Sequence, residues 1–176
     1  MEHLDLVRMI QDGVAPGVWA DLGSGLGAFT MALADLLGPG GRIVSVDRDG
    51  GALRRQREAM AARFPATAVE YVQADFGRGL DLPALDGVVM ANSLHFARRK
   101  SPVLALVRRA LRPGGRLVLV EYDADRGNPW VPHPLSYATW ARVSLESGFV
   151  DTRLLSRRPS RFLGAMYSAL SLRPPA

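Results

Sequence analysis

Short apolar runs alternate with segments of helical spacing along most of the chain, and this alternation constrains the fold more than any other feature. The first five runs lie at about 18–22, 43–47, 69–72, 87–91 and 117–121. Segments with helical spacing lie at about 28–37, 52–64 and 101–112. Continuous Val, Ile and Leu runs are typical of parallel strands buried on both faces. The sequence therefore predicts a Rossmann-like, doubly wound α/β sheet with helices on both faces.

Two further strands are expected near the C-terminus, after a Pro-rich loop at 128–134 and a helix at about 135–146. They lie at about 150–156 and 162–170, with only residues 157–160 to connect them. A parallel crossover needs about a dozen residues or more, so these strands must pair antiparallel. The predicted sheet has seven strands and is mostly parallel, with an antiparallel C-terminal strand.

The ends of two predicted helices carry capping signals. Asp49 is expected to cap the helix that runs from about Ala52 to Phe64. The following helix is expected to have Ser101 as its N-cap and Pro102 at its first position. Pro113-Gly114-Gly115 is then expected to end that helix and start the next strand.

The 176 residues are expected to form a single domain. Leu4, Val7 and Ile10 share one face of a helix, which predicts a short N-terminal helix within 1–13. This helix either packs on the domain or acts as a lid over a site.

Composition excludes several kinds of chemistry. The chain has no Cys, so disulfides, thiolate nucleophiles and Cys-ligated zinc are excluded, and no metal site is expected. The net charge of +5 comes almost entirely from Arg, since Lys100 is the single lysine. This charge indicates either a compositional bias or a polyanion site. No apolar run approaches the roughly 18 residues of a membrane helix, which predicts a cytoplasmic protein.

A glycine-rich motif, Asp21-Leu22-Gly23-Ser24-Gly25-Leu26-Gly27-Ala28, follows the first strand. Such glycines let the chain turn sharply and bring backbone N–H groups close to a ligand. The spacing also fits a dinucleotide fingerprint, with Asp47 about 20 residues further on. However, the Asp21 carboxylate would repel a pyrophosphate, whereas it would suit a ligand with an ammonium and a sulfonium. S-adenosylmethionine is such a ligand.

Five motifs occur in order between about Val18 and Tyr122: ADLGSGLG, IVSVDRD, VQADF, DGVVMANSLHF and LRPGGRLVLVEYD. With these motifs the chain resembles class I S-adenosylmethionine-dependent methyltransferases, in the group similar to ubiquinone/menaquinone C-methyltransferases. The resemblance implies a Rossmann-like fold, S-adenosylmethionine as cofactor and methyl transfer as the activity. It also implies an antiparallel last strand, in agreement with the prediction above.

The resemblance implies roles for residues of the first two motifs. Gly23, Gly25 and Asp21 would border the methionine part of the cofactor. Asp47, followed by Arg48, would accept hydrogen bonds from both ribose hydroxyls, because a carboxylate has two acceptor oxygens. The alternatives are a strand-to-helix turn for the glycines and a helix-capping or loop acid for Asp47. Asp47→Ala is expected to abolish cofactor binding without unfolding the protein.

The third and fourth motifs would complete the cofactor site. By the same resemblance, Asp75 would bind the adenine amino group, Phe76 would lie beside the ring, and Asn92 would lie near the transferable methyl. The alternatives are that Asp75 is a turn residue before Gly77 and that Asn92 forms an Asx turn.

The methyl acceptor is harder to infer, because in-line transfer from a sulfonium needs orientation more than a base. His95 and His133 are the candidates for a general base, and surface or packed side chains are the alternative. Trp130, Tyr137 and Trp140 are expected in the core, with an aromatic acceptor pocket as the alternative.

The favoured hypothesis is a methyltransferase that acts on a small molecule at carbon or oxygen. It is expected not to associate with membranes, and both a monomer and a homodimer are considered. One alternative is a nucleic-acid methyltransferase that acts on rRNA or tRNA, favoured by the net charge of +5 and by Arg98-Arg99-Lys100. Another is a non-catalytic, cofactor-binding subunit, favoured by the short chain.

Overall fold

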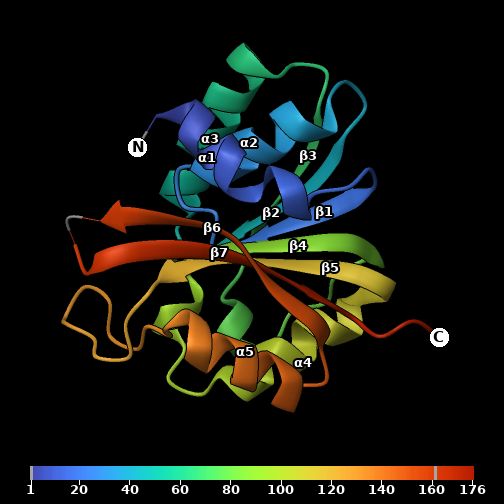
Figure 1. Cartoon of the computed structure of the whole chain (residues 1–176). Coiled ribbons are helices and arrows are strands. Elements are labelled where there is room, and N and C mark those ends of the chain that lie inside the picture. The colour runs from blue at the N-terminus through green and yellow to red at the C-terminus, as the bar shows by residue number, and fades with distance from the viewer. Residues whose placement is uncertain (1, 161) are drawn as a thin grey trace.

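The computed structural model describes residues 2–160 and 162–176. Its strands form one sheet in the order β3-β2-β1-β4-β5-β7-β6 (Figure 1). Their bounds are Val18–Leu22 for β1, Arg42–Asp47 for β2, Ala68–Gln73 for β3, Leu85–Ala91 for β4, Leu111–Tyr122 for β5, Val150–Ser160 for β6 and Gly164–Leu172 for β7. β1 to β5 are parallel, and β7 is antiparallel to both of its neighbours, β5 and β6. The predicted seven-stranded fold class is confirmed.

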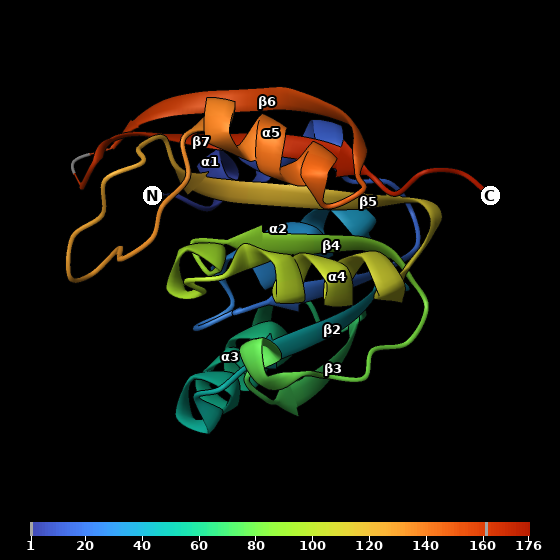
Figure 2. The ribbon, with the colours of Figure 1, turned by 90° about the horizontal axis from the view of Figure 1, so that it is seen from below.

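Helices cover both faces of this sheet. They are α1 His3–Ile10, α2 Ala28–Leu37, α3 Gly50–Arg63, α4 Lys100–Ala110 and α5 Tyr137–Glu146, with short 3₁₀ turns η1 Gln11–Gly13, η2 Phe76–Arg78 and η3 Leu94–Phe96. Figures 1 and 2 show α1, α2 and α3 on one face and α4 and α5 on the other. The doubly wound arrangement expected from the alternating pattern is therefore present.

The sheet separates two hydrophobic clusters, and alternate residues of β5 enter different ones. Leu117 and Leu119 join the cluster that contains Trp140 of α5, whereas Val118 and Val120 join the cluster of α1 and α2. All four β5 side chains are completely buried. A continuous apolar strand is required here, because successive side chains point to opposite, covered faces.

Capping predictions were right for one helix and wrong for another. Asp49 caps α3, since its Oδ1 accepts hydrogen bonds from the backbone N–H groups of Gly51 and Ala52. Ser101, however, is not an N-cap: α4 begins one residue earlier, and Ser101 lies exposed in its first turn. Pro102 fits at the third helical position because N–H groups of the first turn have no intrahelical partner.

The segment Pro113-Gly114-Gly115 lies within β5, which begins at Leu111, directly after α4 ends at Ala110. The predicted end of the helix, at about residue 112, therefore comes two residues too late. The register between β4 and β5 shifts between Leu85 and Gly87, so this segment forms an irregular start of a long strand.

The C-terminal hairpin is antiparallel, as predicted, but its strands meet at a tighter turn. Residues 157–160, expected as the connection, continue β6, and the pairing extends to Ser160 opposite Gly164. Phe162, expected in the last strand, lies in the turn, where its side chain is 55% exposed.

The N-terminal helix packs on the domain. Its buried residues are Leu6, Val7, Met9 and Ile10, while Leu4 is 60% exposed, so the predicted apolar face was partly wrong. α1 packs against α2 and also reaches the C-terminal strands, because Ser168 Oγ donates a hydrogen bond to the Met9 carbonyl.

The three aromatic residues expected in the core have different positions. Trp140 of α5 is fully buried, as predicted, and Tyr137 is partly buried against the edge of the Tyr167 ring. Trp130 is 71% exposed, so the core prediction was wrong for it. Trp130 lies in the Pro-rich loop, where Asn128 Oδ1 accepts its backbone N–H and closes a local turn. The local turn holds the backbone without burying the ring.

Candidate active site

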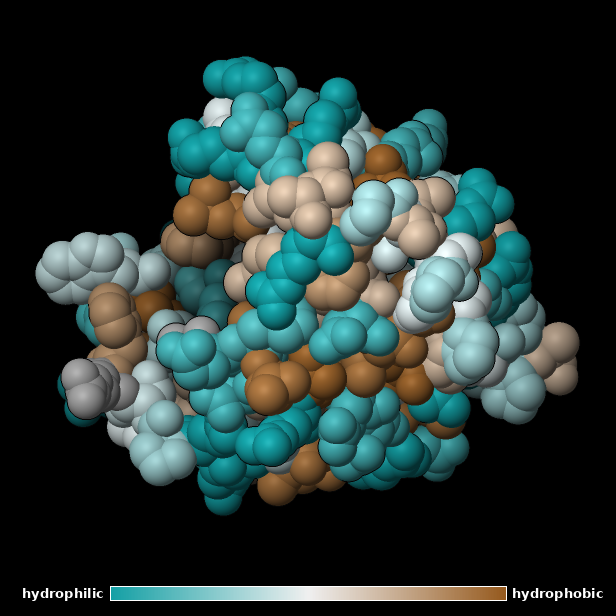
Figure 3. All heavy atoms as spheres, turned by 90° about the horizontal axis from the view of Figure 1, so that it is seen from above, coloured by the Kyte–Doolittle hydropathy of each residue, from teal (hydrophilic) through white to brown (hydrophobic). Residues whose placement is uncertain are grey.

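A cleft of about 510 Å³ lies at the carboxyl ends of the parallel strands. It is lined by Gly23, Asp47, Arg48, Asp49, Ala74, Asp75, Phe76, Gly77, Arg78, Asn92, Ser93, Phe96 and Ala97. Figure 3 shows the molecule hollowed on its left side, with apolar residues at the rim. Ligands of open α/β sheets bind at this edge, so the cleft lies where the fold predicts a site.

The glycine loop forms one end of the cleft. Gly23, Gly25 and Gly27 all have positive φ, and the Gly23 N–H donates to the Val46 carbonyl at 2.8 Å. A Cβ at Gly23 would lie 2.4 Å from Ser93 Cβ, whereas one at Gly25 would meet no atom within 4 Å. The turn therefore requires glycine, and at Gly23 the close approach of Ser93 adds a second reason.

Asp47 connects the glycine loop to the start of α3. Its Oδ2 accepts the Gly25 N–H at 2.7 Å, and its Oδ1 accepts the Asp49 N–H at 2.8 Å. Each carboxylate oxygen has a second lone pair, so Asp47 can still accept two ligand hydroxyls. Its neighbour Arg48 also lines the cleft and is exposed.

Asp75 and Phe76 lie together in the cleft wall at η2. Asp75 Oδ1 accepts the Gly77 N–H at 2.9 Å, which is the turn role named as the alternative. The same side chain lines the cleft, and its Oδ2 lies 3.5 Å from Arg78 Nε. The turn fixes the carboxylate, which leaves acceptor capacity toward the cleft.

Asn92 occupies a left-handed conformation directly after β4, with φ 52°. Its Oδ1 is buried and has no hydrogen-bond partner in the described part of the chain. An unpaired buried oxygen is costly, and a ligand N–H or O–H group in the cleft would satisfy it.

Asp21 and Gly25 are not among the residues that line the cleft. Asp21 is 1% exposed and accepts a hydrogen bond from Thr30 Oγ1 at 2.7 Å, beneath the glycine loop. Burial raises the pKa of Asp21 to about 7, although the Thr30 hydrogen bond opposes the rise. Its carboxyl group thus connects the end of β1 to α2.

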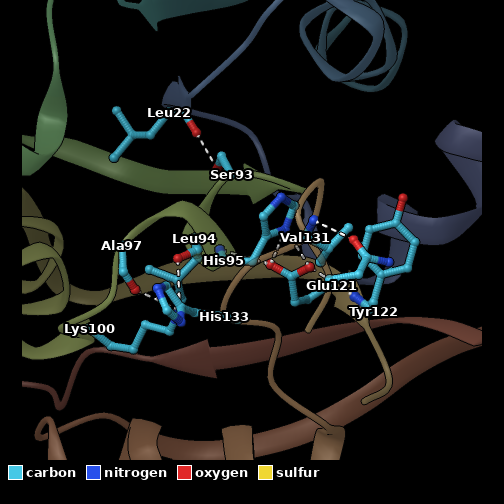
Figure 4. Close-up of polar contacts among 11 residues, drawn as sticks. Leu22, Ser93, Leu94, His95, Ala97, Lys100, Glu121, Tyr122, Val131 and His133 are labelled. Atoms are coloured by element: carbon cyan, nitrogen blue, oxygen red, sulfur yellow. Dashed lines mark hydrogen bonds and ion pairs between the residues drawn. The ribbon is translucent and has the colours of Figure 1, made fainter. Parts of the chain in front are cut away.

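The two histidines differ sharply in environment. His95 is 3% exposed, and its Nδ1 lies 2.9 Å from Oε1 of the fully buried Glu121 (Figure 4). His133 is exposed and lies in the Pro-rich loop, where its backbone N–H donates to the His95 carbonyl. Neither histidine is among the residues that line the cleft, although Phe96, next to His95, is.

Lys100 ties the Pro-rich loop to η3. Its Nζ donates to the carbonyls of Leu94, Ala97 and His133 at 3.0, 2.8 and 2.7 Å (Figure 4). Burial lowers the pKa of the Lys100 ammonium to about 8, and the Glu121 carboxylate opposes the change. Of the basic triplet at 98–100, only Arg98 and Arg99 are therefore exposed cations.

Several residues that shape the site were not predicted from the sequence. Ser93 and Phe96 line the cleft, and Gln56 lies fully buried behind the glycine loop. For Gln56 a signal was present: it occupies the same helical face as the apolar residues Ala52, Leu53 and Met60. A polar residue on a buried face needs partners, which points to a buried network.

These residues fit S-adenosylmethionine. The Gly23 backbone provides a close approach, the Asp47 carboxylate provides acceptors for a diol, and the orphaned Asn92 oxygen provides an acceptor for a donor group. Phe76 provides an apolar face beside Asp75 in the same wall. The fold and cleft thus define a Rossmann-like α/β protein with the features of a nucleoside-binding site.

Comparison with known proteins assigns the family. The family model described as "Methyltransferase domain" matches residues 20–117, more than half of the chain. The chain therefore belongs to the methyltransferase domain family. This confirms the class recognised from the five motifs, the S-adenosylmethionine-dependent methyltransferases, together with its cofactor.

Curated relatives include ubiquinone/menaquinone biosynthesis C-methyltransferases UbiE. The protein from Ectopseudomonas mendocina is 34% identical over 120 residues, 66% of this chain and 46% of that protein. The protein from Hahella chejuensis is 32% identical over 132 residues, 74% of this chain and 52% of that protein. The chain thus spans about half the length of the curated relatives it matches.

Solved structures share the fold at low sequence identity. The 1,6-didemethyltoxoflavin-N1-methyltransferase of Burkholderia thailandensis, with S-adenosylhomocysteine bound, has a TM-score of 0.76 at 19% identity, covering 98% of this chain and 78% of that one. A SAM dependent methyltransferase from Aquifex aeolicus has a TM-score of 0.74 at 17% identity, covering 96% and 89%. Among the described residues, no helix has the length and apolar character needed to cross a membrane.

Proposed function

We propose that this chain transfers the methyl group of S-adenosylmethionine to a small-molecule acceptor at carbon or oxygen. The observation that carries the proposal is the cleft itself, where the glycine turn, the Asp47 carboxylate and the orphaned Asn92 oxygen lie on one edge of the sheet. Bound there, S-adenosylmethionine supplies an activated methyl carbon. The chain's own task is to hold the acceptor in line with that carbon and to exclude water.

Different residues of the cleft are proposed to bind different parts of the cofactor. Asp47, flanked by Arg48, accepts the ribose hydroxyls, and Asp75 with Phe76 holds the adenine. Gly23 permits close approach of the methionine part, which Asn92 binds through its free oxygen. Asp21 and Gly25 act indirectly, by holding the loop in shape.

His95 is the stronger of the two candidate bases. Its Nδ1 is hydrogen-bonded to Glu121, and when that nitrogen carries the proton, Nε2 keeps a free lone pair that can accept one. His95 does not line the cleft, but its neighbour Phe96 does, so we propose that His95 Nε2 takes the proton from a hydroxyl or an acidic C–H of an acceptor that is bound beside Phe96. The His133 side chain is exposed, and we assign it no step.

A small acceptor is proposed over a nucleic acid. The Lys100 ammonium donates hydrogen bonds to three backbone carbonyls. Of the basic residues 98–100, this leaves Arg98 and Arg99 as exposed cations. One structural neighbour, the 1,6-didemethyltoxoflavin-N1-methyltransferase of Burkholderia thailandensis, is named for a small-molecule acceptor. The homodimer and the cytoplasmic location remain predictions from the sequence.

Binding of the cofactor by these residues is tested by calorimetric titration with S-adenosylmethionine, S-adenosylhomocysteine and NAD in parallel. We expect micromolar binding of the two adenosyl compounds and none of NAD. Asp47→Asn should weaken that binding by at least tenfold, while Asp81→Asn, the same change of charge on an exposed loop, should not alter it. Binding of NAD alone would show that the cofactor is wrong.

The acceptor class is tested by release of S-adenosylhomocysteine from S-adenosylmethionine in the presence of small phenols, enols and heterocycles, and separately of total RNA. Turnover with a small compound that persists at high salt supports the proposal. Turnover with RNA alone, falling steeply with salt, contradicts it, because phosphate binding depends on counterion release.

A further inference from the structure

Gln56 of α3 lies behind the glycine loop and is completely buried. Its Nε2 donates to Thr30 Oγ1 at 2.7 Å and to Ser45 Oγ at 2.9 Å, and its Oε1 accepts from Ser24 Oγ at 3.2 Å. These three partners belong to α2, to β2 and to the glycine loop. One side chain therefore joins three segments that meet behind the cleft.

Gln56 also packs directly against the loop backbone. Gly27, which precedes α2 with φ +83°, is so close that an added Cβ would lie 2.4 Å from Gln56 Cγ. Gln56 thus contacts the loop twice, by a hydrogen bond to Ser24 and by packing on Gly27. Movement of this side chain must move the loop or open a gap beneath it.

The network continues to Asp21, which accepts from Thr30. Ser45 Oγ also donates to Ser24 Oγ at 2.8 Å, so the hydroxyls and the amide form a connected set with every member at most 9% exposed. Buried polar networks fix geometry strongly when all members are satisfied, and removing one member leaves its partners unpaired.

The N-terminal end of α3 lies next to Asp47. Asp49 caps α3, and Asp47 Oδ1 accepts the Asp49 N–H, so the start of α3 and the Asp47 carboxylate are held together. Gln56, two turns along α3, contacts the glycine loop. The helix therefore joins the proposed ribose-binding acid to the proposed methionine-binding loop.

We propose that Gln56 is a positioning residue that sets the glycine loop relative to Asp47 and thereby controls affinity for the methionine half of the cofactor. The inference rests on the proposed function. Gln56 itself does not contact the ligand. It acts on the loop through its hydrogen bond with Ser24 and its packing against Gly27.

The test compares two ligands with each variant. S-adenosylhomocysteine spans both halves of the proposed site, whereas 5′-methylthioadenosine lacks the amino-acid part. For Gln56→Leu, similar in size but without hydrogen bonds, we expect affinity for S-adenosylhomocysteine to fall at least tenfold and affinity for 5′-methylthioadenosine to change less than twofold. Ser24→Ala, which leaves Gln56 in place, should also weaken binding of S-adenosylhomocysteine more than of 5′-methylthioadenosine, but by a smaller factor. This variant provides the test if Gln56→Leu does not fold.

Thr152→Val provides a matched control. Thr152 Oγ1 bridges Ser144 and Ser171 at 2.7 and 2.8 Å, in a second hydroxyl network between α5, β6 and β7, none of whose members lines the cleft. This variant should lower the melting temperature while the ratio of the two affinities stays unchanged.

The outcomes separate the two proposals. If the wild-type protein binds neither ligand, the proposed function is wrong. If the wild-type protein binds both and the Gln56 and Ser24 variants bind both equally well, the positioning role is overturned. Equal weakening of both ligands also overturns it, because that result describes a general structural role.

Discussion

Glu121 Oε1 lies 2.9 Å from His95 Nδ1, and the same carboxylate accepts the backbone N–H groups of His95 and Tyr122. A single buried side chain at the end of β5 thereby fixes the start of η3, the turn that follows β4. Since Ser93 and Phe96 flank His95 and line the cleft, Glu121 supports one wall of the site from behind.

Replacing Glu121 by Gln should lower the free energy of unfolding while the fold is kept. The amide keeps one acceptor oxygen where the carboxylate oxygens now serve three N–H donors. We expect the free energy of unfolding to fall by about 2–4 kcal/mol, measured by urea unfolding. Glu146→Gln, which removes the exposed pair with Arg142, should cost less than about 1 kcal/mol. Equal losses in the two variants would contradict the structure.

The raised pKa of Asp21 predicts that the stability of the protein depends on pH. Its folded pKa, about 7, lies above the ordinary value of 3.8, so the folded state holds the proton more tightly than the unfolded chain. Stability from this group is complete below pH 4 and is lost as pH rises through 7, by up to about 4 kcal/mol. Unfolding of wild-type protein and Asp21→Asn between pH 4 and pH 8 tests this, because the variant should lack that decline.

Lys100→Met should release the Pro-rich loop. Without the ammonium, the carbonyls of Leu94, Ala97 and His133 lose a shared donor. We expect amide hydrogen exchange at 128–134 to speed up by about tenfold or more, with little change in β5. Arg126→Met, which removes an exposed cation two residues before this loop, should leave exchange unchanged. Unaltered protection in Lys100→Met would show that the contacts do not hold the loop.

Gly23 and Gly25 form a matched pair for testing the turn. Both have positive φ, but only at Gly23 would a Cβ collide with Ser93. Gly25→Ala should cost about 1 kcal/mol of stability, from conformation alone, whereas Gly23→Ala should cost about 2–4 kcal/mol. Thermal unfolding compares the two, and a larger loss in Gly25→Ala would contradict the close approach of Ser93.

Features with a local or periodic cause could be predicted from the sequence. The apolar runs of β1 to β5 indicated buried parallel strands, and the short connection before β7 indicated an antiparallel pair. Asp49 caps its helix through N–H groups only two and three residues away. Such signals need no knowledge of distant parts of the chain.

Features that depend on contacts across the fold could not be predicted in the same way. The His95 and Glu121 side chains are 26 residues apart, and they meet only because β4 and β5 are neighbours. Ser101 has a side chain suited to an N-cap, yet α4 begins before it, at Lys100, whose ammonium donates to the carbonyl of His133, 33 residues away. Trp130 has the size of a core residue, but its loop provides no surface that buries it.

The position of β7 between β5 and β6 has a consequence for synthesis on the ribosome. β6 precedes β7 in the chain, yet β7 is its only strand partner among the described residues. As the chain emerges, β1 to β5 can assemble with α2, α3 and α4, while β6 and α5 must wait for Gly164–Leu172. The nascent chain therefore exposes an unpaired β5 edge until β7 is synthesised, and an unpaired strand edge can pair with another chain.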